Sequence, residues 1–196
     1  MGKSMSNKIH LKKSSSSPIK KKQENKDFSD MEDFSDMEIV CRGEVFRCHR
    51  IIMSASSPVF RAMLQGKWKE SESRKVIIDD IMPATMTELL YYIYTGLVKV
   101  TVSIYSVVDL LVAADKYQLD LLKIICEERL CSSLKVANCV EYLVVGDMYQ
   151  TFKLRRMAMR QAAENVDSII DTVVFKDLFK QKPELAWEVM KTQNKK

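Results

Sequence analysis

The second half of the chain carries a helical periodicity that constrains its fold more than any other feature. From Ser103 onward, apolar residues recur three and four positions apart, which places them on one face of an α-helix. The spacing predicts a series of helices: 103–117, 119–130, 136–148, 152–163, 168–179 and 183–190. Because amphipathic helices must cover their apolar faces, we expect these helices to stack on one another.

The stretch before Ser103 mixes short strands with helices. Ser57 can cap a helix whose first residue is Pro58, and Pro83 opens another helix that Thr95-Gly96 ends. A brief extended piece is expected over 98–102. Three short runs are typical of strands, the first two joined by an Arg42-Gly43 turn: 37–41, 45–48 and 76–78. We therefore predict an α+β fold, a small β-sheet flanked by helices and then an all-α region.

The charge of the chain is concentrated at its N-terminus. The net charge is +5, but residues 1–26 alone hold eight lysines and one glutamate, or +7. Residues 27–196 hold 23 basic and 25 acidic groups, or −2. The globular part is therefore not expected to bind nucleic acid directly.

Residues 1–26 are too polar to bury the apolar area that would offset their ordering entropy, so we predict a disordered basic tail. Two interpretations stay open, a nuclear import signal and a solubilising tail. The clusters that would form the import signal are Lys12, Lys13, Lys20, Lys21 and Lys22. Ser17 precedes a proline and resembles a proline-directed phosphorylation site. Residues 193–196 are also predicted to be disordered.

No apolar run approaches the roughly 20 residues that a membrane span needs. The N-terminus also lacks the apolar core of a signal peptide. We expect an intracellular protein, in the nucleus and/or the cytoplasm, without a membrane partner.

Cysteines and histidines give no pattern for a metal site. The histidines are His10 and His49, and His49 directly follows Cys48, which is not a usual spacing of zinc ligands. We predict no metal and no disulfide. Instead, we expect five buried free thiols: Cys41, Cys48, Cys126, Cys131 and Cys139.

No catalytic arrangement of residues emerges. His49 stands where a strand meets a helix, a place that favours a structural role. The acidic pairs Asp79-Asp80 and Glu127-Glu128 are adjacent in sequence, so their side chains do not share one face. The glycines are isolated, which gives no phosphate-binding loop. We expect no enzyme and no cofactor.

Several separated strings resemble the BTB/POZ domain family in the expected order. Residues 34–64 (FSDMEIVCRGEVFRCHRIIMSASSPVFRAML) resemble the start of such a domain, and 91–98 (YYIYTGLV) and 109–130 resemble its Tyr-Thr-Gly turn and helical hairpin. Residues 131–192 resemble the helices that follow this domain in speckle-type POZ proteins. The resemblance divides the chain into a tail (1–26), a BTB/POZ domain (27–131), a three-box and partial BACK region (132–192) and a C-terminus (193–196).

The resemblance implies two protein interfaces. A surface for the N-terminal domain of cullin-3 would use Trp68, Lys69, Glu70 and Tyr94. A two-fold dimer interface would use Phe28, Met31, Ile51, Ile52 and Met53. The alternatives are a Trp68 folded onto its own domain, a Tyr94 in the core and an Ile52 in the monomer core.

The function that the resemblance implies is a dimeric adaptor that links an unknown protein substrate to a cullin-3 ubiquitin ligase. The place that a substrate-binding MATH domain takes in speckle-type POZ proteins is held here by the basic tail. One alternative is a regulator that pairs with other BTB proteins. Another is a dimeric scaffold, for example in transcriptional regulation, without ligase contact.

Overall fold

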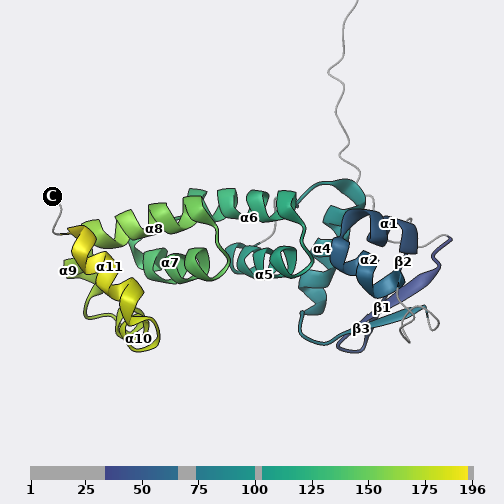
Figure 1. Ribbon diagram of the computed structural model, residues 1–196, viewed down its shortest axis with the longest axis horizontal. Coiled ribbons are helices and arrows are strands. Elements are labelled where there is room, and N and C mark those ends of the chain that lie inside the picture. The colour runs from purple at the N-terminus through teal and green to yellow at the C-terminus, as the bar shows by residue number, and fades with distance from the viewer. Residues whose placement is uncertain (1–33, 66–73, 100–102, 194–196) are drawn as a thin grey trace, which may run out of the picture.

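The computed structural model describes residues 34–65, 74–99 and 103–193. The molecule is elongated in Figure 1, with the sheet and the first helices at one end, a double row of helices in the middle and the C-terminal helices at the other end. The predicted α+β class is confirmed. Phe28, Met31, the tail lysines, Ser17 and the segment Trp68–Glu70 lie outside the described residues.

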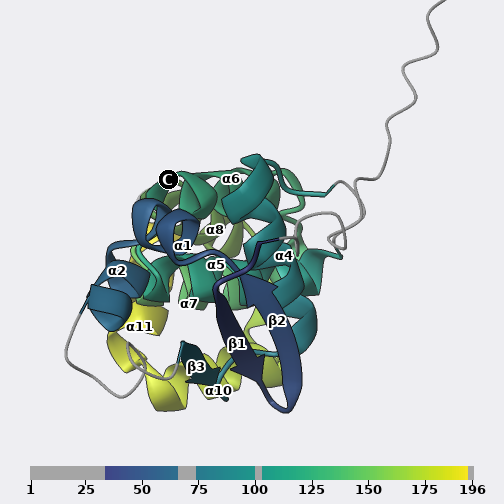
Figure 2. The same cartoon turned by 90° about the vertical axis from the view of Figure 1, so that its right-hand side faces the viewer.

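The sheet has three strands in the order β2-β1-β3. β1 (Met37–Cys41) pairs antiparallel with β2 (Glu44–Cys48) and parallel with β3 (Lys75–Ile78), as Figure 2 shows. Arg42 and Gly43 form the predicted hairpin turn, both with positive φ, 49° and 91°, which suits the twist of the strands. Every second residue of β1 is buried, so one face of the sheet packs on the helices.

Two short helices follow the hairpin, α1 (Arg50–Ser56) and α2 (Pro58–Gln65). The residue between them, Ser57, is wholly buried. Its hydroxyl accepts a hydrogen bond from the Phe60 N–H at 3.1 Å and donates one to the Tyr117 carbonyl at 2.6 Å. The predicted cap of α2 is therefore confirmed, and the same oxygen ties α2 to a residue 60 positions later.

The next helices are α4 (Pro83–Thr95), α5 (Ile104–Lys116) and α6 (Asp120–Ser132). The extended piece predicted over 98–102 is not a strand in its described residues, 98 and 99. The reason is a group distant in sequence, because the Arg129 guanidinium donates to the carbonyls of Val98 and Lys99, both at 2.9 Å. These two acceptors are thus engaged by a side chain of α6 rather than by a neighbouring strand.

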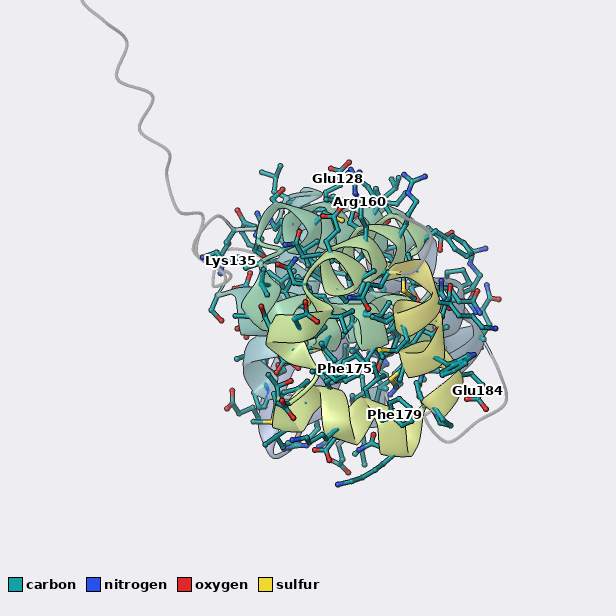
Figure 3. The ribbon with its side chains drawn as sticks, turned by 90° about the vertical axis from the view of Figure 1, so that its left-hand side faces the viewer. Glu128, Lys135, Arg160, Phe175, Phe179 and Glu184 are labelled. Atoms are coloured by element: carbon teal, nitrogen blue, oxygen red, sulfur yellow. The ribbon has the colours of Figure 1, made fainter. Side chains whose placement is uncertain are left out.

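The C-terminal part consists of the 3₁₀ turn η2 (Val136–Asn138) and five helices: α7 (Cys139–Met148), α8 (Phe152–Glu164), α9 (Val166–Ile169), α10 (Val173–Gln181) and α11 (Pro183–Gln193). The single helix predicted over 168–179 is wrong, because Thr172 interrupts it. Its hydroxyl donates to the Ile169 carbonyl and accepts from the Phe175 N–H, which starts α10. Figure 3 looks onto this end of the molecule.

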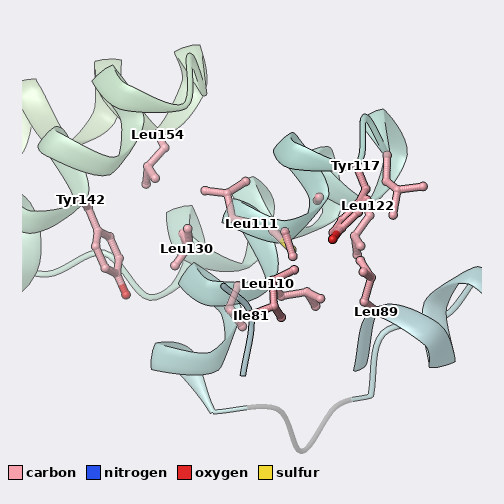
Figure 4. Packing of buried hydrophobic residues seen from close by; sticks show 14 of the residues in the cluster. Ile81, Leu89, Leu110, Leu111, Tyr117, Leu122, Leu130, Tyr142 and Leu154 are labelled. Atoms are coloured by element: carbon pink, nitrogen blue, oxygen red, sulfur yellow. The ribbon is translucent and has the colours of Figure 1, made fainter. Parts of the chain in front are cut away.

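One apolar core runs through the described residues from the sheet to α11. Figure 4 shows its central part, where Leu89 of α4 and Leu110 of α5 lie near Tyr117 and Leu122. The core continues from Leu130 into the C-terminal helices. In α5, α6 and the turn between them, the residues that the helical spacing predicts to face inward are all buried: Val107, Leu110, Leu111, Ala114, Tyr117, Leu119, Leu122, Cys126 and Leu130.

Gly146 of α7 lies where α7 approaches α8 most closely. A Cβ on Gly146 would come within 2.7 Å of the backbone nitrogen of Arg155 and 2.8 Å of its Cα. Backbone atoms in a helix cannot move aside cheaply, so only glycine permits this approach.

We expect Gly146→Ala to lower the free energy of unfolding by about 1–3 kcal/mol, the usual cost of overpacking. The better helix propensity of alanine, worth up to about 1 kcal/mol, offsets only part of it. Urea denaturation followed by circular dichroism measures the change. Met148→Ala, at an exposed position of the same helix, is the matched control and should change little. Equal stability of Gly146→Ala and the parent chain would contradict the close approach.

Candidate protein-interaction surfaces

The α1 helix presents an apolar surface to solvent. Ile51 is 75% exposed and Ile52 is half-buried. The helix is held in place at its first residue, because the Arg50 N–H donates to Asp36 Oδ1 at 2.8 Å and its guanidinium donates to the Leu64 carbonyl at 2.6 Å. An exposed isoleucine on an anchored helix is a candidate contact for a partner.

Met53 does not belong to that surface. It is the buried residue of α1 and has no exposed area in the single chain. In a helix, residues 51 and 53 point in different directions, so one turn cannot present the whole apolar trio to a partner. We therefore remove Met53 from the proposed dimer interface and keep Ile51 and Ile52.

Tyr94 is half-buried near the end of α4 and bonded to His49. Its hydroxyl accepts from the His49 N–H at 2.9 Å and lies 2.9 Å from Nδ1, to which it donates when the imidazole proton is on Nε2. Burial raises the pKa of Tyr94 to about 12. The hydroxyl of Tyr94 is thus engaged within its own domain, while the residue as a whole is only partly buried. His49 has the structural role that its position favours.

A groove of about 300 Å³ lies beside this end of α4. Tyr92, Ile93 and Gly96 line one side, and Leu119 and Leu121 line the other. Gly96 ends α4 in the left-handed conformation, with φ of 70°, which turns the chain away and leaves the groove open. The groove is thus bordered by the start of α6.

Two exposed apolar residues lie on α6, Leu121 in the lining of this groove and Ile124 three residues further on, and the sequence pattern did not single them out. Leu121 is 69% exposed and Ile124 is 51% exposed, and their spacing of three places them on one side of the helix. The sequence does contain a signal for them. Apolar residues fill most of 119–126, and this number is larger than a single buried helix face needs. An apolar side that its own chain leaves uncovered is a candidate partner surface.

A second groove, of about 520 Å³, lies between α7 and α10. It is lined by Val144 and Met148 on one side and Val174 and Leu178 on the other, with charged residues at its rim. Phe175 is buried and packs near Phe179, with ring centroids 6.5 Å apart. The apolar residues of α10 thus serve partly in packing and partly at the surface.

The five cysteines are free and buried, as predicted. Burial raises the pKa of each thiol, that of Cys48 and of Cys126 to about 12. A thiol that stays protonated is a poor nucleophile and a poor metal ligand. Within the described ranges, no group of three or more His, Cys, Asp and Glu could hold a metal ion. None of the helices there is long and apolar enough to cross a membrane.

The comparison with known proteins identifies the class. The model of the BTB/POZ domain family matches residues 25–134, and the chain therefore belongs to this family. The matched residues cover the three-stranded sheet and the helices through α6.

Two mouse proteins are similar over a longer stretch. TD and POZ domain-containing protein 1 of Mus musculus is 35% identical over 154 residues, 79% of this chain and 42% of that protein. TD and POZ domain-containing protein 5 of Mus musculus is 34% identical over 147 residues, 75% of this chain and 43% of that protein. The chain thus spans less than half the length of these relatives.

Among solved structures, the BTB domain of human gigaxonin is 30% identical with a TM-score of 0.45, covering 51% of this chain and 80% of that one.

We expect the native protein to react slowly with Ellman's reagent at pH 8, because burial excludes the reagent and the raised pKa keeps the thiols protonated. In concentrated guanidinium chloride all five cysteines should react promptly. Absorbance at the wavelength of the released thiolate measures both rates. Prompt reaction of several thiols in the native protein would contradict their burial.

Proposed function

We propose that this chain is a dimeric BTB adaptor that binds the N-terminal domain of cullin-3 and links a protein substrate to a cullin-RING ubiquitin ligase. BTB domains typically mediate dimerisation and cullin-3 binding, and this chain belongs to that family. The observation that carries the proposal is the uncovered apolar side of α6, Leu121 and Ile124, at the groove beside the end of α4.

The proposed cullin surface combines the end of α4, the exposed apolar residues Leu121 and Ile124 of α6 and the segment that follows α2. Tyr94 would contribute its ring rather than a free hydroxyl, because the hydroxyl is already bonded to His49. Trp68 would be the apolar anchor, since an aromatic side chain in a polar stretch is a frequent hot spot. Lys69 and Glu70 would supply polar contacts at the rim.

The proposed dimer centres on α1. A two-fold interface uses the same patch on both copies, so Ile51 of one copy meets the equivalent surface of the other. Ile52 would lie beside it, and Phe28 and Met31 of the leader stay part of the proposal. Dimerisation would place two adaptor surfaces in one assembly, which raises avidity for a partner with two sites.

The helices after α6 would correspond to a three-box and partial BACK region. In this proposal the chain performs no chemistry itself. Its contribution is proximity, because a substrate held near the ligase reacts in an effectively intramolecular step. The substrate is a protein whose identity no residue pattern indicates.

A dimerisation partner of other BTB proteins, without ligase contact, is the second candidate. The observation that favours it is the exposed apolar surface of α1, which alone would suffice for pairing. The same surface would serve a dimeric scaffold, for example in transcriptional regulation.

Isothermal titration calorimetry with the purified N-terminal domain of cullin-3 tests the adaptor. We expect Trp68→Ala and Glu70→Lys each to weaken binding at least tenfold, about 1.4 kcal/mol. Lys176→Ala, on α10 at the far end of the molecule, should leave affinity unchanged. A folded dimer that does not bind would leave only the scaffold or the dimerisation partner. Cullin-3 binding that neither variant changes would support the adaptor function and contradict the assignment of Trp68 and Glu70 to the binding surface.

Ile51→Lys should convert the dimer to a monomer, because the introduced charges meet each other across the two-fold axis. Analytical ultracentrifugation gives the mass in solution. Ile77→Lys, at another exposed isoleucine on β3, is the matched control and should remain dimeric. A dimer that survives Ile51→Lys would place the interface elsewhere.

A further inference from the structure

The α8 helix carries a stripe of cations that begins at an exposed phenylalanine. Phe152, Arg156 and Arg160 follow one another at intervals of four, so they lie along one side of the helix. Phe152 is 76% exposed, and the side chain of Arg160 is 81% exposed. Figure 3 shows Arg160 at the outer surface of this end. Residues 152–160 contain four basic residues and no acidic one.

The stripe borders a groove of about 720 Å³ between α8 and α11. Phe152, Arg156 and Arg160 line one side, and Glu188 and Thr192 of α11 line the other. The buried side chain of Met159 contributes an apolar surface. The groove is thus large enough for several side chains of a peptide and has both apolar and cationic lining.

The charged side chains around the groove differ in how many ion pairs they form. Arg155 is bound on two sides, with Nη2 2.6 Å from Glu188 Oε2 and Nε 3.1 Å from Asp147 Oδ1. Glu188 is therefore engaged by Arg155. Arg156, next in sequence, forms no ion pair with any residue of the described part of the chain. One guanidinium at the groove thus has all its donors available.

The two flanking cations are only weakly paired. Arg160 Nε lies 3.0 Å from Glu164 on the same helix, and Lys153 Nζ lies 3.9 Å from Glu128. Both pairs are exposed, and exposed pairs contribute between about 0 and 1 kcal/mol. A ligand carboxylate could therefore displace either partner at little cost, and an arginine binds a carboxylate through two parallel hydrogen bonds.

The chemistry of the groove selects a short acidic peptide over a longer polyanion. Glu128 and Glu164 stand at the two ends of the cationic stripe and would repel a phosphate backbone that continued past it. A peptide can instead place two carboxylates within the stripe. Phe152 then offers an apolar contact that a uniformly charged ligand would not use.

We propose that the groove between α8 and α11 binds a short acidic segment of a partner protein, with carboxylates on Arg156 and Arg160 and an apolar side chain against Phe152. Peptide binding here is independent of the cullin surface. Only the further step, that the partner is the substrate of the adaptor, rests on the proposed function.

Fluorescence anisotropy with the full chain tests the proposal. The probe is a labelled peptide of sequence DFSDMEDFSDME, which repeats the acidic and aromatic pattern of residues 27–38 and so has the required chemistry. We expect saturable binding that weakens as salt rises. The double variant Arg156→Glu/Arg160→Glu should weaken it at least tenfold, and Phe152→Ala at least threefold. All three residues are exposed, so the variants should keep the circular dichroism spectrum of the parent.

Three controls separate the proposal from its alternatives. Lys176→Glu, at an exposed lysine of α10, should leave affinity unchanged. The same peptide with Asn and Gln in place of Asp and Glu should not bind, and a single-stranded oligonucleotide of equal length should bind more weakly. Absence of peptide binding, binding that the groove variants do not change, or tighter binding of the oligonucleotide would each overturn the proposal.

Cullin-3 binding, measured with the same double variant, distinguishes the two proposals. We expect it to be unchanged, because Tyr94 lies on α4, whereas Arg156 and Arg160 lie on α8. A parallel loss of cullin-3 and peptide binding would assign the groove to the cullin surface and overturn a separate peptide site. If the chain binds the peptide but not cullin-3, the result would support the peptide site between α8 and α11 and contradict only the proposed adaptor function.

Discussion

The arrangement of the whole molecule depends on the contacts of Tyr117. Its ring stacks on Phe60 with centroids 4.4 Å apart and planes 4° from parallel, and its carbonyl accepts the hydroxyl hydrogen bond of buried Ser57. Tyr117 ends α5, so these contacts fix the start of α6 against α2. The stacked ring pair thus joins the sheet end of the molecule to the double row of helices in Figure 1.

At the C-terminal end of the molecule, a cluster of charged residues holds the helices together. Arg155 of α8 bonds to Asp147 of α7 and to Glu188 of α11, and Lys182 also reaches Asp147, at 2.7 Å. Burial would raise the pKa of Asp147, but the hydrogen bonds from Lys182 and Arg155 outweigh it and hold that pKa below its usual range. The cluster joins three helices and engages Arg155 and Glu188, while Arg156 of α8 has no ion-pair partner among the residues that the structure describes.

Much of the fold could be predicted because its determinants are local. The α5 and α6 faces follow from helical spacing, the α2 cap from Ser57-Pro58 and the hairpin from Arg42-Gly43. The failures arose where a distant or competing group decided the outcome. Arg129 engages the carbonyls of Val98 and Lys99, and Thr172 interrupts a helix whose spacing is otherwise continuous. Periodicity also could not tell which apolar residues of α1 and α6 other elements would cover: Met53 of α1 is buried, whereas Leu121 of α6 is exposed.

The proposed adaptor would hold two partners at once, so its two surfaces must not overlap. The α1, α4 and α6 surfaces are apolar, with α1 and α4 toward the sheet end and α6 in the middle of the molecule, whereas the groove between α8 and α11 is cationic and lies toward the other end (Figure 1). Apolar and charged surfaces also attract different ligands, which reduces competition between them. In the proposed adaptor, the continuous apolar core between these surfaces would hold the two partners at a defined separation.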